Sequence, residues 1–330
     1  IGFFFNTMYN VVDSFYAGQV STTALAALAL SFPVFFIIIA VSEGIARGSS
    51  ALIANAIGAK DREEELALSS QVFSLGFLCA IGLTVIGLTV APPLFKAMGA
   101  SGAYLDIANR YISPLFWGAI FFLLSSMSNP VLLANGDSKT FGRVLVAGFF
   151  LNLVLDPWFL YGGFGLPAFG IAGIACAPAV IRALGGLYRL TTGWRRGYVR
   201  FTGLNCLMPQ WKTYGMILKQ GVPTSFNMMS IALGFFVTTY FLKYYGQVSV
   251  AAFGVGTRIE QIALLPAIGI SAAIVSVVGQ NNGAGKLDRV RECVQLCVCY
   301  GFVLIAVASV LLFAFAEPLV RLFTKDSEVI

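Results

Sequence analysis

An asparagine and an aspartate interrupt one of the long apolar runs of this 330-residue chain. They are Asn152 and Asp156, within the stretch LNLVLDPWF. A spacing of four residues places both side chains on one face of an α-helix, one turn apart. Pro157 follows directly, and its ring would free the backbone carbonyl of Leu153 one turn earlier. Carboxylate, amide and carbonyl oxygens together suit a hard cation such as Na⁺.

A second acidic side chain, Asp13, lies in the apolar stretch NVVDSFYAG near the start of the chain. An ionisable group inside a membrane segment is costly, which makes a functional role the default hypothesis. Two structural interpretations stay open: Asp13 as a carboxylate at a helix end, and Asn152 with Asp156 as a hydrogen-bond clamp between helices. Buried carboxylates could also carry protons, because burial penalises the charged form. The residues therefore predict an ion-coupling site at Asp13, Asn152 and Asp156 and leave Na⁺ or H⁺ open.

Other charged residues in apolar runs are candidates for a cavity or a gate. Glu43 and Arg47 are four residues apart, which predicts mainly a mutually neutralising pair. Arg258 and Glu260 are only two apart and cannot pair along a helix. They either pair with other helices or face a central cavity. Pro157 belongs with these candidates because of the carbonyl that it frees.

Several kinds of chemistry are excluded. The chain has no histidine, so it has no imidazole relay and no histidine metal site. Its six cysteines form no CxxC pair and lie mostly in apolar runs, which argues against zinc and a disulfide framework. The GAGK turn lacks the spacing of a phosphate-binding loop. We therefore predict that the protein is not an enzyme and needs no cofactor beyond a coupling ion.

The elements that position these residues are predicted to be membrane-spanning helices. Hydrophobic residues make up 58% of the chain and charged residues 11%, where soluble domains have about 25% charged residues. Apolar runs recur near or beyond the roughly 20 residues that cross a bilayer. The pattern predicts an all-α polytopic membrane protein with about nine helices, the third ending at Pro92–Pro93. The predicted ranges are 1–18, 24–56, 64–91, 105–134, 139–162, 170–193, 212–244, 249–281 and 288–315.

Loop charges predict the orientation in the membrane. Fourteen of the 21 Lys and Arg residues lie in four stretches, whereas the alternate loops carry few. Because basic loops stay on the cytoplasmic side, we expect a multi-pass protein of the plasma or inner membrane with these stretches inside the cell. The net charge of +6 then reflects loops and not nucleic-acid binding. The basic stretches are 58–65, 136–143, 182–219 and 284–292.

The chain also contains an internal repeat. GQVSTTALAAL from Gly18 matches GQVSVAAFGVG from Gly246, and IGAKDREEE (57–65) matches AGKLDRVRE (284–292). Both halves start on the same side, and such parallel repeats build transporters with a central site between two lobes. We expect the chain to be a fragment that lacks residues at both ends, including the last three helices. The predicted lobes are an N-lobe of six helices, 1–197, and a truncated C-lobe of three, 198–330.

These motifs resemble a known family. VVDSFYAG, ANAIGAKD, LNLVLDPWFLYG and RIEQIALLPAIGISAAIVSVVGQNNGAGKLDRVRE are similar to stretches of the multidrug and toxic compound extrusion (MATE) transporters. The resemblance covers nearly the whole chain. It implies twelve helices in two six-helix lobes. It also implies export of cationic and amphipathic compounds by alternating access, driven by Na⁺ or H⁺.

The resemblance favours the DinF-like branch of that family. The coupling residues of that branch correspond to Asp13, Asn152 and Asp156. A threonine of the same constellation corresponds to Pro178, which has no hydroxyl, so proton coupling or a carbonyl ligand near Ile174 becomes a candidate. The glutamate of the NorM-like branch falls on Ile231.

The predicted function is therefore a cation-coupled antiporter that exports drugs or toxic compounds. Its expected partners are small organic cations and the bilayer, with no nucleic acid and no obligate protein partner. One alternative is a flippase for lipid-linked intermediates, which would favour a basic cavity for phosphates built from Arg47 and Arg258. A channel or structural membrane protein is the other alternative, and the repeat and the buried acids argue against it.

Overall fold

The computed structural model confirms the all-α prediction, and no β-strand occurs among the residues that it describes. These residues are 2, 4, 5, 8, 9, 12, 16, 22–97, 100–163, 167–200, 204–245 and 247–321. The α-helices are α2 (Thr22–Gly58), α3 (Arg62–Ala97), α4 (Gly102–Trp117), α5 (Ala119–Ala134), α6 (Ser138–Tyr161), α7 (Ile171–Arg195), α8 (Trp211–Leu242), α9 (Gln247–Gly283), α10 (Leu287–Ala314) and α11 (Ala316–Arg321). Two short 3₁₀ turns, Leu204–Leu207 and Lys243–Tyr245, precede α8 and α9.

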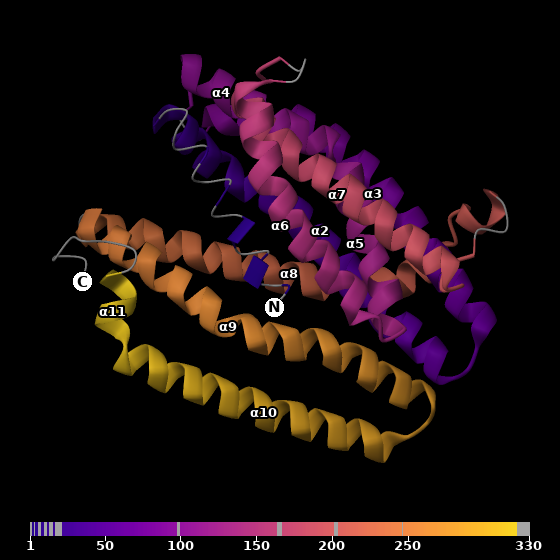
Figure 1. Cartoon of the computed structure of the whole chain (residues 1–330). Helices are drawn as coiled ribbons and strands as arrows, with labels where there is room; N and C mark the ends of the chain where they lie inside the picture. The colour runs from indigo at the N-terminus through magenta and orange to yellow at the C-terminus, as the bar shows by residue number, and fades with distance from the viewer. Residues whose placement is uncertain are drawn as a thin grey trace.

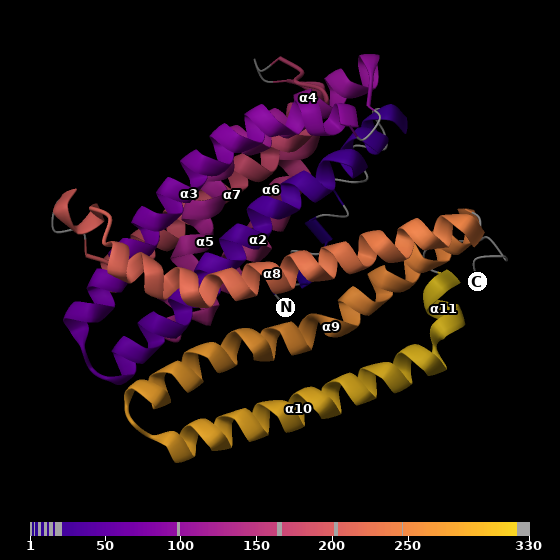
Figure 2. The ribbon, with the colours of Figure 1, turned by 180° about the vertical axis from the view of Figure 1, so that it is seen from behind.

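Length and composition make this an integral membrane protein. Within the described residues, six helices are long and apolar enough to cross a bilayer, and the bent pair of α4 and α5 counts as a seventh span. Figures 1 and 2 show α3 to α7 packed as a bundle on one side, with α8, α9 and α10 side by side on the other. Helix α2 joins the two groups, because it contacts α3, α4 and α5 and also packs along α8 and α9.

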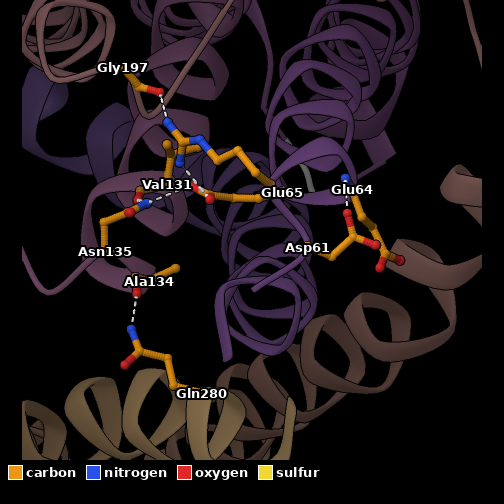
Figure 3. A network of polar contacts seen from close by, with 9 residues as sticks. Asp61, Glu64, Glu65, Val131, Ala134, Asn135, Gly197 and Gln280 are labelled. Carbon is orange, nitrogen blue, oxygen red and sulfur yellow. Dashed lines mark hydrogen bonds and ion pairs between the residues drawn. The ribbon is translucent and has the colours of Figure 1, made fainter. Parts of the chain in front are cut away.

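The turns rich in basic residues gather at one end of the molecule, which we call the basic end. Arg62 at the start of α3 donates hydrogen bonds to Glu65, at 2.5 Å, and to the carbonyl of Gly197 beyond α7. Glu65 also accepts from Asn135, the residue after α5. Gln280 of α9 donates to the carbonyl of Ala134 at 2.6 Å. Figure 3 shows this network, which ties α3, α5, α9 and the segment after α7 together.

Two predicted helix boundaries are wrong. Helix α3 runs through Pro92 and Pro93 to Ala97, because buried residues on both sides of the prolines hold it in the core: Ala91 is 1% and Phe95 0% exposed. The predicted fourth helix is divided into α4 and α5 with a bend of 45°. The break lies at Gly118, where a Cβ would come within 2.8 Å of a side-chain atom of α7.

The turns after α2 and α9 have the same backbone form, in a register that differs from the sequence match. Lys60 and Gly285 both adopt a left-handed conformation, with φ of 59° and 69°. The following residues, Asp61 and Lys286, donate to carbonyls five positions earlier. The structure therefore equates Lys60 with Gly285, whereas the sequence match aligned Gly58 with that glycine. The sequence match paired Gly58 with Gly285 because the residues are identical. The shared left-handed conformation pairs Lys60 with Gly285 instead.

Candidate functional site

The asparagine–aspartate pair lies in the interior of α6, one turn apart as predicted. Both Asn152 and Asp156 are 0% exposed. Asp137 begins the helix by accepting a hydrogen bond from the backbone N–H of Thr140 at 3.1 Å, and the helix continues through Pro157 to Tyr161. A carboxylate and an amide are thus held on adjacent turns and removed from the surface of the described chain.

Helix α7 covers this part of α6. Leu155 packs in one cluster with Ala177 and Ile181 of α7. At Gly173 of α7 the helices approach closely, since a Cβ there would lie 2.5 Å from the carbonyl oxygen of Phe159. Helix α7 therefore packs closely along the half of α6 that carries the pair, because the glycine lets the two backbones approach.

Oxygen donors at this place fit a cation, although the described residues alone do not complete a site. Within the described part of the chain, no three His, Cys, Asp or Glu side chains are placed so that they could hold a metal ion together. Asp13, the predicted third member, lies outside the described residues. Two first-helix residues that flank it in sequence pack near the pair. Tyr9 joins the cluster of Leu155, and Tyr16 joins that of Leu160.

The two proline candidates each free a backbone carbonyl at the level of the pair. Pro157 has no N–H for the carbonyl of Leu153, and Pro178 has none for the carbonyl of Ile174. Both prolines lie inside continuous helices, α6 and α7. Ile174 is 0% exposed, so its carbonyl is a candidate oxygen donor in place of the hydroxyl that Pro178 lacks.

The other predicted candidates lie elsewhere. Glu43 and Arg47 form the expected ion pair in α2, with 3.4 Å between Oε2 and Nε. Arg47 also donates to the hydroxyl of Ser271 at 3.5 Å, so this pair faces α9. Glu260 is exposed on α9, and the side chain of Arg258 lies outside the described residues. The structure therefore does not bring Glu43 or Glu260 to the Asn152–Asp156 pair.

One polar cluster was missed by sequence reasoning. Arg189 is only 2% exposed within α7, and it donates to the side-chain oxygens of Ser125 and Asn129 in α5. Both Arg182 and Arg189 belong to the basic stretch 182–219, and both lie within the predicted helix 170–193, which α7 confirms. Their spacing of seven residues was the available signal, because it places two charges on one helix face.

Comparisons with known proteins agree with this architecture. The MatE family model matches residues 1–158 and 223–330. The "Probable multidrug resistance protein YoeA" of Bacillus subtilis is 28% identical over 310 residues, covering 93% of this chain and 67% of that protein. The "Probable multidrug resistance protein NorM" of Thermotoga maritima is 28% identical over 331 residues, covering 98% of this chain and 69% of that protein.

Solved structures share the fold. One is described as the outward-facing conformation of a multidrug resistance MATE family transporter of the MOP superfamily. It superposes with a TM-score of 0.90 at 28% identity, covering 99% of this chain and 73% of that chain. From the matched family segments, the shared helical fold and these relatives, we conclude that the chain belongs to the MatE family of multidrug and toxic compound extrusion transporters.

Proposed function

We propose that this transporter is a cation-coupled antiporter that exports cationic and amphipathic compounds, with Asn152, Asp156 and Asp13 as its coupling site. The complete burial of Asn152 and Asp156 on adjacent turns is the observation that carries the proposal. Among the described residues, the buried acids Glu65 and Asp137 form ion pairs with arginines at the basic end. Asp156 is 0% exposed within α6, where a transported ion could neutralise it.

Coupling follows from the cost of burying charge. A carboxylate without its neutralising ion is disfavoured in apolar surroundings, so charged and neutralised forms prefer different helix packings. Binding of Na⁺ or H⁺ at Asp156 and Asp13 would favour one packing of the first helix against α6 and α7. Substrate affinity would change with that packing, which is the differential interaction that ion coupling requires.

Alternating access would move the two proposed lobes, 1–197 and 198–330, about the central site. The basic end would be cytoplasmic, as the positive-inside rule predicts. Contacts between α2 and α9 at this end support a conformation closed towards the cytoplasm. A Cβ on Gly58 would lie 1.9 Å from the carbonyl oxygen of Gln280. Transport would require these helices to separate.

The residue at position 178 bears on the coupling ion and on the proposed DinF-like branch. A buried proline supplies no hydroxyl, so a Na⁺ site would use the carbonyls freed at Ile174 and Leu153. A proton needs no such ligand set and only a carboxylate that can be protonated. Both ions therefore stay within the proposal, and the transport assay below distinguishes them.

The test uses the complete protein in liposomes loaded with a fluorescent cationic dye. Efflux is followed under an imposed Na⁺ gradient and, separately, under an imposed pH gradient. We expect efflux under one gradient and its loss in Asp156→Asn and Asp13→Asn. Asp106→Asn is the matched control, since Asp106 is an exposed acid of α4. Normal ion-dependent efflux by well-inserted Asp156→Asn protein would refute the assignment.

The flippase and channel alternatives give different results in the same liposomes. A flippase would move a lipid-linked phosphate and leave the dye, whereas a channel would show passive conductance. The flippase alternative relied partly on Arg47, which is paired with Glu43. A neutralised arginine contributes less to a phosphate cavity, so the structure supports the antiporter more strongly.

A further inference from the structure

A cavity lies between the first helix, α6 and α7, away from the Asn152–Asp156 pair. Its walls include Tyr9, the apolar side chains of Leu145 and Ile181, and both Arg182 and Arg189. Its accessible volume is about 30 Å³, within an open hollow whose empty space, with the solvent at its mouth, is about 360 Å³. Gly148, one turn nearer the basic end than Asn152, also lines it. The cavity therefore occupies the basic-end side of the proposed coupling site.

Among the described residues, the polar partners of Arg189 are neutral groups. Its guanidinium donates to Ser125, to Asn129 and, at 3.1 Å, to the carbonyl of Gly185. Among the ion pairs of the described residues, none involves Arg189. A buried charge without a counter-charge is unfavourable. An anion in the cavity would supply that counter-charge, because Arg189 itself lines the cavity.

Arg182 places a second positive charge in the same cavity. Its guanidinium carbon lies 5.3 Å from the centre of the Phe122 ring, and no carboxylate of the described chain pairs with it. The two arginines lie on one face of α7 and repel each other. A single anion in the cavity would therefore stabilise both charges together.

We propose that this cavity binds the phosphate group of an anionic phospholipid. Guanidinium groups match phosphate oxygens with paired hydrogen bonds, and basic pockets between membrane helices bind anionic headgroups. The apolar walls formed by Leu145 and Ile181 suit the adjoining glycerol and acyl chain. Free inorganic phosphate has the same recognition chemistry and is distinguished by experiment. The site does not depend on the proposed coupling mechanism.

The experiment measures thermal unfolding of the purified complete protein in mixed lipid–detergent micelles under three conditions. The added lipid is phosphatidylcholine alone, phosphatidylcholine with phosphatidylglycerol, or phosphatidylcholine with inorganic phosphate in the buffer. We expect phosphatidylglycerol to raise the unfolding temperature of the natural protein by several degrees. Arg182→Gln should lose at least half of that rise. Arg195→Gln, which removes the same charge from an exposed position of α7, should keep it.

A second variant tests the cavity without changing its charge. Leu145→Phe fills the space while both arginines remain, so it too should lose the rise, and it decides the matter if Arg182→Gln does not fold. An equal rise from inorganic phosphate, lost in the same variants, would assign the site to free phosphate. The proposal is overturned if neither probe raises the unfolding temperature. It is also overturned if Leu145→Phe keeps the full rise.

Discussion

Gly283 of α9 lies directly against the backbone of Asn55 in α2. A Cβ on Gly283 would be 1.9 Å from the carbonyl oxygen of Asn55, and a Cβ on Gly58 would be 1.9 Å from that of Gln280. Gly58 and Gly283 are 225 positions apart, as are Asn55 and Gln280. The contact is therefore reciprocal: each repeat places its glycine on the backbone of the other, at the basic end.

This contact predicts that Gly283→Ala destabilises the protein. The added methyl group must push α2 and α9 apart, and overpacking of this kind costs about 1–3 kcal/mol. Thermal unfolding of the purified protein should show a lowered midpoint. Gly269→Ala in the same helix is the control, because nothing lies within 4 Å of a Cβ there. Equal midpoints for the two variants would show that the helices separate without cost.

Gln71 links α3 to the segment before α8, and we predict that its loss loosens that segment. Its amide donates to the carbonyls of Cys206 and Met208, both at 2.9 Å, and its carbonyl accepts from the N–H of Gln210 at 3.0 Å. Gln71→Leu removes three hydrogen bonds to a segment that is partly exposed. Water can replace some of these bonds, so we expect a cost of about 1 kcal/mol. We expect faster proteolysis within residues 204–210 and a lower unfolding midpoint. The exposed Gln220→Leu should change neither quantity, and a normal cleavage rate in Gln71→Leu would contradict the prediction.

Removing Arg62 and removing Glu65 from their ion pair should lower the stability of the protein by different amounts. Glu65 has a buried side chain, 5% exposed, whereas that of Arg62 is 52% exposed. Arg62→Gln leaves a buried carboxylate without its cation, and we expect a cost of about 1–3 kcal/mol, reduced by the solvent exposure of Arg62. Glu65→Gln leaves an arginine that water can solvate and should cost less. Unfolding midpoints of both single variants and the double variant test this order, and the reverse order would refute it.

We predict that Pro178→Thr makes dye efflux more sensitive to Na⁺. Pro178→Thr supplies a hydroxyl beside the proposed site and should lower the Na⁺ concentration needed for half-maximal dye efflux. Pro178→Ala removes the same ring without adding an oxygen and serves as the control. Identical Na⁺ dependence of the two variants would show that a hydroxyl at this position does not bind the ion.

Local properties of the residues were enough for several predictions. Apolar runs longer than a bilayer crossing predicted an all-α membrane protein. In lipid the backbone N–H and C=O groups must bond to each other, and an α-helix does this within a single segment. The four-residue spacing predicted that Asn152 and Asp156 share a helix face, and it predicted the Glu43–Arg47 pair. In each case the interacting groups are near in sequence, so helix geometry alone relates them.

Contacts between distant segments decided the rest. The prolines at 92 and 93 predicted the end of a helix, but the buried Phe95 outweighs that tendency. Gly118 divides α4 from α5 because α7 lies close against it. The burial of Arg189 depends on Ser125 and Asn129, some sixty residues earlier in the chain. Spacing along the sequence determines which residues share a face of a helix. Only packing in three dimensions determines which residues that face contacts.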